Sequence, residues 1–427
     1  MTDRSIRVVL FALVALASPL RAQDRVITLA GQVLVSGGTN GSGTNALFSD
    51  PAAIVADSTG NLFVADSQNH AIRRISTNGL VTTLAGELGL AGSRDETGAQ
   101  ARFDSPCGIT LDKNGNLFVS DTGNHTIRQI TPAGVVTTLA GLAGQSGLTD
   151  ATGSAARFNS PLGIAISTNG TIYVADCGNH LIRAISPGGS VTTLAGSPEN
   201  WGSANGSGAD ARFNGPVGLV LDNEGNLFVA DSNNHTIRRI TPDGTASTWA
   251  GVPGVDGCVD GAAQSAKFSK PAELAIDRRN NLFVADSFNH VIRKITRDRN
   301  VSTVTGAAGK WGAADGINGR ARFFNPYGLA IQPVGSLVVA DAYNELIRVV
   351  LIPFELSIRT TNNASATIIS WDGVIGRRYQ VQFKPRIDSA AWLNLGTPVT
   401  AGDLVVSRTD TSLNADAQRI YRVIVVE

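Results

Sequence analysis

The sequence has no net charge, few cysteines, few aromatic residues and no helical periodicity, and each of these absences excludes a class of protein. Its 35 Lys and Arg residues equal its 35 Asp and Glu residues, so no net charge draws it to nucleic acid or to an anionic membrane surface. Three cysteines are an odd number, which excludes a framework in which every thiol is paired within the chain. Aromatic residues make up only 6%, and no stretch shows a helical hydrophobic period. Short apolar runs are instead separated by turns rich in glycine, of which there are 47.

The apolar run near the start, residues 8–16, is far shorter than the ~20 residues of a membrane-spanning helix. Arg4 and Arg7 precede this run and Ala22 follows it, as in a secretory signal with a small-residue cleavage site. We therefore predict that residues 1–22 are a signal peptide and that the mature bacterial protein is secreted or periplasmic, with no transmembrane segment left. A retained anchor is the competing interpretation.

A repeat of 55 residues runs through most of the chain, and a fixed period is the signature of a repeat architecture. Five histidines, each preceded by Asn, keep this step: His70, His125, His180, His235 and His290. Six aspartates keep it too: Asp66, Asp121, Asp176, Asp231, Asp286 and Asp341. A proline and an arginine also recur, at Pro51 and Arg73 in the first copy and at Pro326 and Arg348 in the last. Six copies are therefore present.

Each copy contains four short apolar runs rich in Val, Ile, Leu, Phe and Thr, separated by Gly-containing turn dipeptides. This pattern predicts a four-stranded antiparallel blade. The sixth copy ends near Leu351 without its Thr-Leu-Ala-Gly strand, whereas an unmatched copy of that strand, residues 26–31, precedes the first repeat. We expect that strand to complete the last blade and close the ring, which removes an exposed edge. The expected fold class is all-β, with a six-bladed β-propeller over residues 25–352.

The five histidines lie in the segments NHA, NHT, NHL, NHT and NHV, inside the wider pattern PxGIAxDxxGNLFVADxxNHxIRxI. Over residues 26–351 the chain resembles the NHL repeat family, which is named for this Asn-His-Leu signature. The resemblance implies a six-bladed β-propeller. It does not imply one function, because NHL propellers include protein-binding, RNA-binding and sensor domains, and a similar fold serves a peptide-amidating lyase and gluconolactonase-like hydrolases.

The repeated histidines cannot share a metal ion in such a ring. Equivalent residues of the third strands stand roughly 15 Å apart, whereas a metal needs its ligands within about 2 to 2.6 Å. We expect the Asp-x-x-Asn-His turns to hold the blades, with each imidazole bonded to a neighbouring backbone or carboxylate group. Glu345 stands at the histidine position of the sixth copy, so that position tolerates exchange. No metal site is predicted.

The loops between copies carry a second periodic feature. Eight residues before a phenylalanine stand Asn40, Asp95, Asp150, Asn205, Asp260 and Asp315. An Asx turn explains this position, and a weak structural Ca²⁺ site in each loop is the alternative, although the regular aspartate spacing of a calcium loop is missing. No other cofactor is expected. One cation per copy also recurs beside these aspartates, which favours ion pairing over a phosphate track and argues against a nucleic-acid partner.

A propeller enzyme would place its site in the central channel. The first strands enter the channel with Ala52, Cys107, Leu162, Val217, Ala272 and Tyr327, each followed by a small residue except at Glu273. Metal hydrolysis needs more than one protein ligand, so Glu273 is only a weak catalytic candidate, and a solvated residue at the channel mouth is the simpler interpretation. Cys107 and Cys177 fall on one face, where a disulfide would need Cα atoms within about 7 Å; the alternative is that both are small buried residues.

The glycine-rich pattern ends near Pro353. Residues 353–427 contain six short apolar runs, which suggests a small β-sandwich. The spacing of Trp371, Tyr379 and Trp392 resembles a shortened fibronectin type III module, with Trp371 and Tyr379 in its core.

We interpret the chain as an exported binding or scaffold protein whose contact face is built from the inter-repeat loops and the Asp-x-x-Asn-His turns. Its partner would be an extracellular or envelope protein or a glycan. Aromatic residues outside the repeat pattern are the candidate contacts, and packing between blades is the alternative for each of them: Trp201, Phe288, Trp311, Tyr327 and Tyr343. The rival is a metal-dependent lyase or lactonase, similar to gluconolactonase, that works in the central channel with Glu273.

Overall fold

The computed structural model describes residues 24–198, 200–317, 319–352, 356–360, 366–372, 378–385, 389–401, 405–412 and 419–426. The expected signal peptide, residues 1–22, lies outside the described residues. The chain forms two compact units, of which the larger spans Arg25–Ile352 and the smaller holds the C-terminal residues. The described part of both units contains strands and short 3-10 turns without an α-helix. No helix in that part could span a membrane.

The larger unit is built from antiparallel sheets of four or five strands, one sheet for each sequence repeat. The first three sheets contain β3 (Pro51–Ala56), β4 (Leu62–Asp66), β5 (Ala71–Ile75) and β6 (Leu80–Ala85); β7 (Pro106–Leu111), β8 (Leu117–Asp121), β9 (Thr126–Ile130) and β10 (Val136–Ala140); and β11 (Pro161–Ile166), β12 (Ile172–Asp176), β13 (Leu181–Ile185) and β14 (Val191–Gly196). The next three contain β16 (Pro216–Leu221), β17 (Leu227–Asp231), β18 (Thr236–Ile240) and β19 (Thr245–Ala250); β21 (Pro271–Ile276), β22 (Leu282–Asp286), β23 (Val291–Ile295) and β24 (Asn300–Gly306); and β26 (Pro326–Ile331), β27 (Leu337–Asp341), β28 (Leu346–Leu351) and β1 (Arg25–Gly31).

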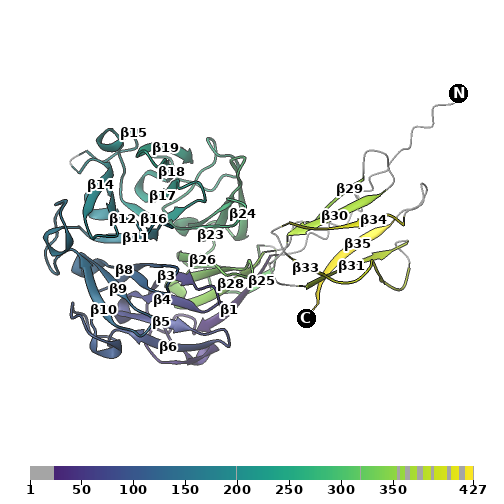
Figure 1. The fold of residues 1–427 in the computed structure, drawn as a ribbon, viewed down its shortest axis with the longest axis horizontal. Helices are drawn as coiled ribbons and strands as arrows, with labels where there is room; N and C mark the ends of the chain where they lie inside the picture. Colours follow the sequence, from purple (N-terminus) through teal and green to yellow (C-terminus); the bar gives the residue numbers. More distant parts are fainter. Residues whose placement is uncertain are drawn as a thin grey trace. The chain divides into compact units, whose positions relative to one another are not determined.

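The sheet of the sixth repeat takes its fourth strand from the start of the unit. β1 pairs antiparallel with β28, with Val26 opposite Val350 and Thr28 opposite Arg348. The sequence predicts this pairing, which holds both ends of the repeat array in one sheet. The first strand of each sheet contacts the first strand of the next, and β26 contacts β3. The sheets therefore follow one another in chain order, as the colours from purple through teal to green show in Figure 1.

Four of the sheets have one strand more than the sequence predicts. The loop that precedes the repeat runs back along the outer strand, so that Gly41 pairs with Val81 at the edge of the first sheet. A pair of residues with no apolar alternation gives no strand signal in the sequence, which explains the omission. These added strands are β2 (Gly41–Ser42), β15 (Gly206–Ser207), β20 (Gly261–Ala262) and β25 (Gly316–Ile317).

Each Asp-x-x-Asn-His turn is one 3-10 turn that ends on a left-handed residue. His180, with φ 58°, donates its backbone amide to the carbonyl of Cys177 at 3.1 Å. The turns of this kind are Ser67–Asn69, Thr122–Asn124, Cys177–Asn179, Ser232–Asn234, Ser287–Asn289 and Ala342–Asn344. Further 3-10 turns in the inter-repeat loops are Gly43–Asn45, Gly98–Gln100, Gly153–Ala155 and Gly208–Asp210.

The hydrophobic core lies between neighbouring sheets. The cluster between the first two sheets joins Ile72 of one sheet to Ile109 and Val119 of the next. Both faces of each sheet are therefore covered by apolar side chains, so the inner strands read as nearly continuous apolar runs. A fully buried phenylalanine precedes the first strand of each sheet: Phe48, Phe103, Phe158, Phe213, Phe268 and Phe323.

The smaller unit has two antiparallel sheets. Trp371 and Tyr379 are buried with ring centres 5.8 Å apart, which confirms the core position expected for both. The segment next to Trp392 forms a strand of only two residues, Leu393–Asn394. One sheet contains β29 (Leu356–Thr360), β30 (Thr367–Asp372) and β34 (Val405–Asp410), and the other contains β31 (Arg378–Lys384), β32 (Leu393–Asn394), β33 (Val399–Thr400) and β35 (Ile420–Val426).

Candidate binding surface

The Asp-x-x-Asn-His turn is a buried polar network, as the third repeat shows. Asp176 ends β12, and its Oδ2 accepts hydrogen bonds from Arg183 at 2.7 Å and from Asn179 at 2.8 Å. Its Oδ1 accepts a third from the backbone amide of Asn159 at 2.7 Å. Asp176 and Arg183 are both fully buried. A charge removed from water needs a partner and hydrogen bonds of this kind, so the network is structural.

The arginine extends this network into the inter-repeat loop. Arg183 donates to Asp150 at 2.5 Å, and its guanidinium lies 5.1 Å from the ring centre of Phe158. Asp150 also accepts the backbone amide of Thr193 at 2.9 Å. The loop position, for which an Asx turn or a weak Ca²⁺ site is expected from the sequence, is thus a partner of the repeat arginine. Equivalent contacts join Arg73 to Asn40, Arg128 to Asp95, Arg238 to Asn205, Arg293 to Asp260 and Arg348 to Asp315.

Burial raises the pKa of the turn aspartates, because the loss of hydration outweighs the arginine and the hydrogen bonds. The pKa of Asp176 is raised in this way. The pKa rises to about 6 for Asp66, Asp121, Asp231, Asp286 and Asp341. Because all these carboxyls are sealed from solvent, a substrate cannot reach them.

Each histidine joins one repeat to the next. His180 Nδ1 accepts the backbone amide of Gly215, which lies 35 residues later, at 3.0 Å. Because Nδ1 is the acceptor, the ring is neutral and carries its proton on Nε2. Burial lowers the pKa of His180, His235 and His290. Equivalent bonds join His70 to Ser105, His125 to Ser160, His235 to Lys270 and His290 to Asn325.

A cation precedes five of the six buried phenylalanines, and the arginines among these cations bond mainly to loop carbonyls rather than to the aspartates. Arg157 donates to the carbonyl oxygens of Ser154 and Ala156, both at 2.8 Å. Arg102 makes the same kind of contact and also pairs with Glu87. These guanidinium groups are therefore engaged in shaping the loops, since each backbone carbonyl needs a donor.

Glu273, on the inner strand β21, is partly buried rather than freely solvated. Its Oε1 accepts the backbone amide of Leu274 at 3.1 Å. Burial raises the pKa of this carboxyl to about 7. The carboxyl lies over Gly218 of the neighbouring strand, where a Cβ atom would stand only 2.7 Å from Oε1. The backbone carbonyl of Ala272 would stand closer still, at 2.4 Å, so the glycine is required first by the close approach of the two inner strands.

Of the two roles that the sequence leaves open for Tyr327, contact with a partner or packing between sheets, the structure favours packing. The tyrosine ring is partly buried and packs against an apolar cluster that includes Val217 and Ala272, both from inner strands. Burial raises the pKa of its hydroxyl. The residue follows Pro326 at the start of an inner strand, so it points toward neighbouring inner strands rather than toward a partner. Glu273 and Asp50 lie close enough to raise the pKa of this hydroxyl further. Among the described residues, however, no three His, Cys, Asp or Glu side chains gather as metal ligands.

The three cysteines are free, so the Cys107–Cys177 disulfide considered from the sequence is not formed. Cys107 Sγ donates to the carbonyl of Ser105 at 3.3 Å. Burial raises the pKa of Cys107 and raises that of Cys177 to about 11. Thiols with a raised pKa hold little thiolate at neutral pH and are poor nucleophiles.

The inter-repeat loops and the 3-10 turns lie together and form a surface that we name the loop face. The amide of Gly144, in one loop, donates to the carbonyl of Asn124, in a turn, at 3.3 Å. The amide of Gly309 bonds in the same way to Asn289 at 3.2 Å. These are the segments on which the sequence predicts the contact surface.

An aromatic cluster lies on the loop face around Phe324. Trp311 stacks on Phe324 with ring centres 4.9 Å apart and planes inclined by 28°. Tyr343 and His290 approach Phe324 edge-on, at 5.2 and 5.8 Å. Trp311 is 62% exposed and Tyr343 is 51% exposed. We name Trp311, Phe324 and Tyr343 the aromatic platform.

Hydrogen bonds fix the backbone beneath the aromatic platform. The amide of Phe324 donates to Asp341 at 2.8 Å, and the amide of Tyr343 donates to the carbonyl of Phe324 at 3.2 Å. The side chain of Asn344 donates to the carbonyl of Gly312, next to Trp311, at 2.6 Å. Rings held in place before binding lose little freedom when a partner arrives.

Phe324, the centre of the platform, is not among the contact residues expected from the sequence, although the repeat register contains the signal. At this position the other five copies carry Ser49, Asp104, Asn159, Asn214 and Ser269, all of them polar. Of the remaining candidates, Trp201 is 66% exposed and Phe288 is 59% exposed. Neither stacks on another ring in the described part of the chain.

Leu34 adds an exposed aliphatic side chain to the loop face. Its backbone amide donates to the carbonyl of Asn344, beside Tyr343, at 3.0 Å, and its side chain is 61% exposed. Its φ of 57° is left-handed, a conformation that costs a side-chain-bearing residue roughly 1–2 kcal/mol. Equivalent loop positions hold Gly89, Gly144, Gly254 and Gly309. Strain of this kind is often stored at functional sites.

Comparison with known proteins agrees with the repeat pattern. Four segments match the NHL repeat family, residues 48–75, 103–130, 158–185 and 213–240. The chain is 32% identical to NHL repeat-containing protein 2 of Gallus gallus over 341 residues, which are 70% of this chain and 46% of that protein. It spans less than half the length of the curated relatives that it matches.

Solved structures share the fold. A protein of unknown function from Bacteroides thetaiotaomicron matches with a TM-score of 0.60 at 22% identity, covering 77% of this chain and 75% of that one. An auxiliary nutrient binding protein from Bacteroides ovatus matches with a TM-score of 0.59 at 17% identity, covering 77% and 76%. At these identities the likeness is one of fold. The chain thus carries NHL repeats in a β-propeller-like, all-β structure.

Proposed function

We propose that this protein is an exported binding or scaffold protein that holds a partner on its loop face through the aromatic platform. The observation that carries the proposal is the stack of Trp311 on Phe324, with Tyr343 against the edge of the same ring. In the other repeats these positions are mostly small or polar, so the repeat scaffold does not need aromatic rings there. Exposed, well-supported aromatic rings are the residues that dominate binding energy at interfaces.

The partner we propose is an extracellular or envelope protein or a glycan, met after export of the chain. A structural neighbour from Bacteroides ovatus is described as an auxiliary nutrient binding protein, which supports a binding role and an envelope location. Equal numbers of acidic and basic residues give no attraction to nucleic acid. The predicted signal over residues 1–22 provides the route of export.

We further propose that residues 25–352 close as a six-bladed propeller and that residues 353–427 form a fibronectin type III-like sandwich. Pairing of β1 with β28 and contact between β26 and β3 support the closure. The two sheets around Trp371 and Tyr379 support the sandwich. The propeller would present the aromatic platform on a rigid frame.

No cofactor is part of the proposal. Asp150, which stands for the loop positions considered for Ca²⁺, already bonds through its oxygens to Arg183 and to Thr193. A cation there would have to displace a guanidinium of the same sign. Thermal unfolding should therefore be unchanged by a calcium chelator, and a loss of stability on chelation would favour structural calcium.

A metal-dependent lyase or lactonase that works in the central channel is the weaker candidate function. Glu273 lies beside Gly218 of the neighbouring inner strand, and among the described residues no three His, Cys, Asp or Glu side chains gather around it as metal ligands. Lyase or lactonase chemistry on a central cation needs several convergent ligands. Turnover of a lactone that is lost in the Glu273→Gln variant would revive this candidate.

The proposed function is tested by partner capture with matched variants. The wild type and the Trp311→Ala/Tyr343→Ala variant are each immobilised and exposed to envelope extract. In a second assay, each soluble protein is applied to a glycan array. We expect the double variant to lose at least about tenfold in affinity for whichever component binds, because truncation of hot-spot residues costs ≥ ~2 kcal/mol. Trp201→Ala is the control, since Trp201 occupies the same loop position without a stacked partner. Equal binding by the wild type and the double variant would refute the platform.

A further inference from the structure

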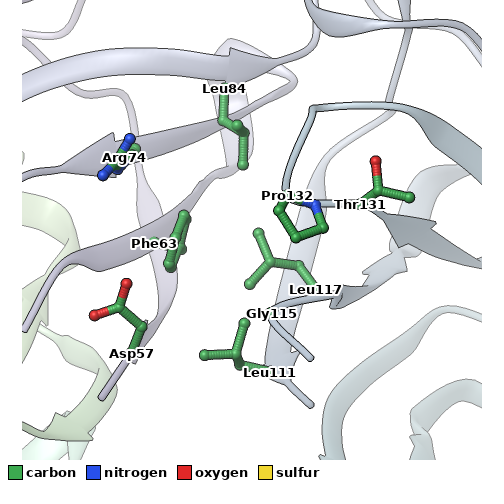
Figure 2. Close-up of a pocket in the computed structure, with 9 residues that line it drawn as sticks. All are labelled: Asp57, Phe63, Arg74, Leu84, Leu111, Gly115, Leu117, Thr131 and Pro132. Carbon is green, nitrogen blue, oxygen red and sulfur yellow. The ribbon is translucent and has the colours of Figure 1, made fainter. Parts of the chain in front are cut away.

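A pocket opens between the sheets of the first and second repeats, at the strand ends away from the histidine turns. Figure 2 shows Phe63 and Leu84 facing Leu117 and Pro132 across the gap, with Arg74 beyond Phe63. The walls are mainly apolar, and Arg74 is exposed. The lining residues are Asp57, Phe63, Arg74, Leu84, Leu111, Gly115, Leu117, Thr131 and Pro132.

The same slot between the fourth and fifth repeats is filled by the protein's own indole. Trp249 stands three repeats after Leu84, and its ring meets Phe228 edge-on with centres 5.3 Å apart. The guanidinium groups of Arg239 and Arg299 lie 5.5 and 4.9 Å from the Trp249 ring centre. Cations over an indole face are attracted by its electron-rich surface. This slot therefore shows which chemistry the site accommodates.

The slot between the first and second repeats has the phenylalanine and the arginine of this arrangement but not the tryptophan. Phe63 and Arg74 stand at the positions of Phe228 and Arg239, and Leu84 replaces Trp249. Gly134 replaces Arg299, so no side chain closes the gap from the second repeat. The other four repeats do not combine a ring with an arginine at these two positions; their residues at the Arg74 position are Gln129, Ala184, Lys294 and Val349.

We propose that the pocket between the first and second repeats binds an indole-sized aromatic ring, held edge-on by Phe63 and capped by the Arg74 guanidinium. Such a ring places its apolar body against Leu111 and Leu117 and its electron-rich face beneath Arg74. Pockets lined mainly by apolar and aromatic side chains, with a few polar groups at their rim, suit an aromatic guest. The ring belongs either to a free indole derivative or to a tryptophan side chain of a partner.

The test is a ¹⁹F NMR titration of the full chain with 5-fluoroindole and, in a second arm, with N-acetyl-5-fluorotryptophanamide. The wild type is expected to bind at one site. The Leu84→Trp variant, which copies the fourth repeat, is expected to fold with a melting temperature close to that of the wild type and to lose binding at least about tenfold. Arg74→Ala is expected to weaken binding about two- to fivefold.

The Gly134→Arg variant copies Arg299 and should block the slot from the second repeat. It replaces Leu84→Trp in the binding measurement if Leu84→Trp does not fold. Arg299 itself is left-handed with φ 64°, so an arginine is tolerated in this backbone conformation. Trp249→Leu/Arg299→Gly is expected to create a second site and raise the stoichiometry to two. Binding in the second arm would extend the site to tryptophan side chains, and binding in the first arm alone would restrict it to free indoles. No binding to the wild type, or equal binding to the wild type and Leu84→Trp, would overturn the proposal.

Discussion

The Oε2 atom of Glu345 accepts a hydrogen bond of 2.6 Å from the backbone amide of Asp50, which lies 295 residues earlier in the chain. The same bond is made in the other repeats by a histidine Nδ1, as from His180 to Gly215. A carboxylate therefore replaces an imidazole where the last repeat meets the first. Oε1 of Glu345 also accepts a hydrogen bond of 2.7 Å from the hydroxyl of Ser36. A neutral imidazole has one acceptor nitrogen, which the backbone amide already uses, so a histidine could not accept both bonds.

Substitution of His180 tests whether an acceptor is all that this position needs. His180→Ala leaves the amide of Gly215 without its bond and should lower the free energy of unfolding by about 1–3 kcal/mol. His180→Glu should retain most of the stability at pH 7, because Glu345 shows that a carboxylate fits the left-handed position. Chemical denaturation of both variants gives the comparison. Equal loss in both would contradict the assignment.

The pH dependence of the same pair follows from the lowered pKa of His180. A histidine whose pKa is lower in the folded state binds its proton less readily there, so its stabilising contribution is present above pH 6.5 and is lost as the pH falls through the folded-state pKa. His180→Glu should remove this part of the loss. As the pH is lowered from 7 to 5, the melting temperature of the wild type should fall more steeply than that of the variant. Parallel curves would contradict a role of His180 in the pH dependence.

Arg183→Met should lower the free energy of unfolding by about 3–5 kcal/mol, because it leaves the buried carboxylate of Asp176 without its counter-charge. The side chain of Arg183 is fully buried, as is that of Asp176. Arg297→Met is the control, since the exposed pair of Arg297 with Glu224, at 3.7 Å, is worth at most about 1 kcal/mol. Urea unfolding measures both. A small loss at Arg183 would mean that the network contributes little.

Glu273→Gln should stabilise the protein at alkaline pH. Burial raises the pKa of Glu273 from 4.5 to about 7, so the folded state holds this proton more tightly than the unfolded state. The contribution to stability is complete below pH 4.5 and is lost as the pH rises through about 7. The variant should therefore exceed the wild type by about 1–3 kcal/mol at pH 8 and match it near pH 4. A constant difference at all pH values would exclude this explanation.

Leu34→Gly should raise the free energy of unfolding by about 1 kcal/mol, because glycine accepts the left-handed backbone that strains leucine. If Leu34 belongs to the contact surface, the same variant should bind the partner more weakly. Thermal unfolding and binding are measured on one preparation. A gain in stability with undiminished binding would place Leu34 outside the contact surface.

The repeat register predicts most of the fold, and the reasons are local. Residues 26–31 match the fourth strand of every repeat, so their pairing with β28 follows from counting copies. The two-residue strand Gly41–Ser42 carries no alternation and could not be predicted. The expected helix-free pattern is confirmed for the described residues, and the core positions of Trp371 and Tyr379 are confirmed as well.

The site was harder to predict because side-chain direction depends on tertiary packing. Tyr327 departs from the repeat just as Trp311 does, yet it follows an inner-strand proline and packs against the apolar cluster. Phe324 shows no exposure signal of its own, and only comparison with Ser49 and its equivalents marks it. The partners of Asp150 lie in other parts of the repeat, at Arg183 and Thr193, so the ion pair could not be inferred from the loop alone.

The most direct test of the proposed function places a photo-crosslinking benzophenone residue at position 311, at position 343 or at the exposed control position 146, which is the same loop position as Trp311 three repeats earlier. The protein is exported from its own cell and irradiated in place. The account predicts covalent adducts from positions 311 and 343 and none above background from Ser146. Adducts of equal yield from position 146, or no adduct from the aromatic platform, would contradict it.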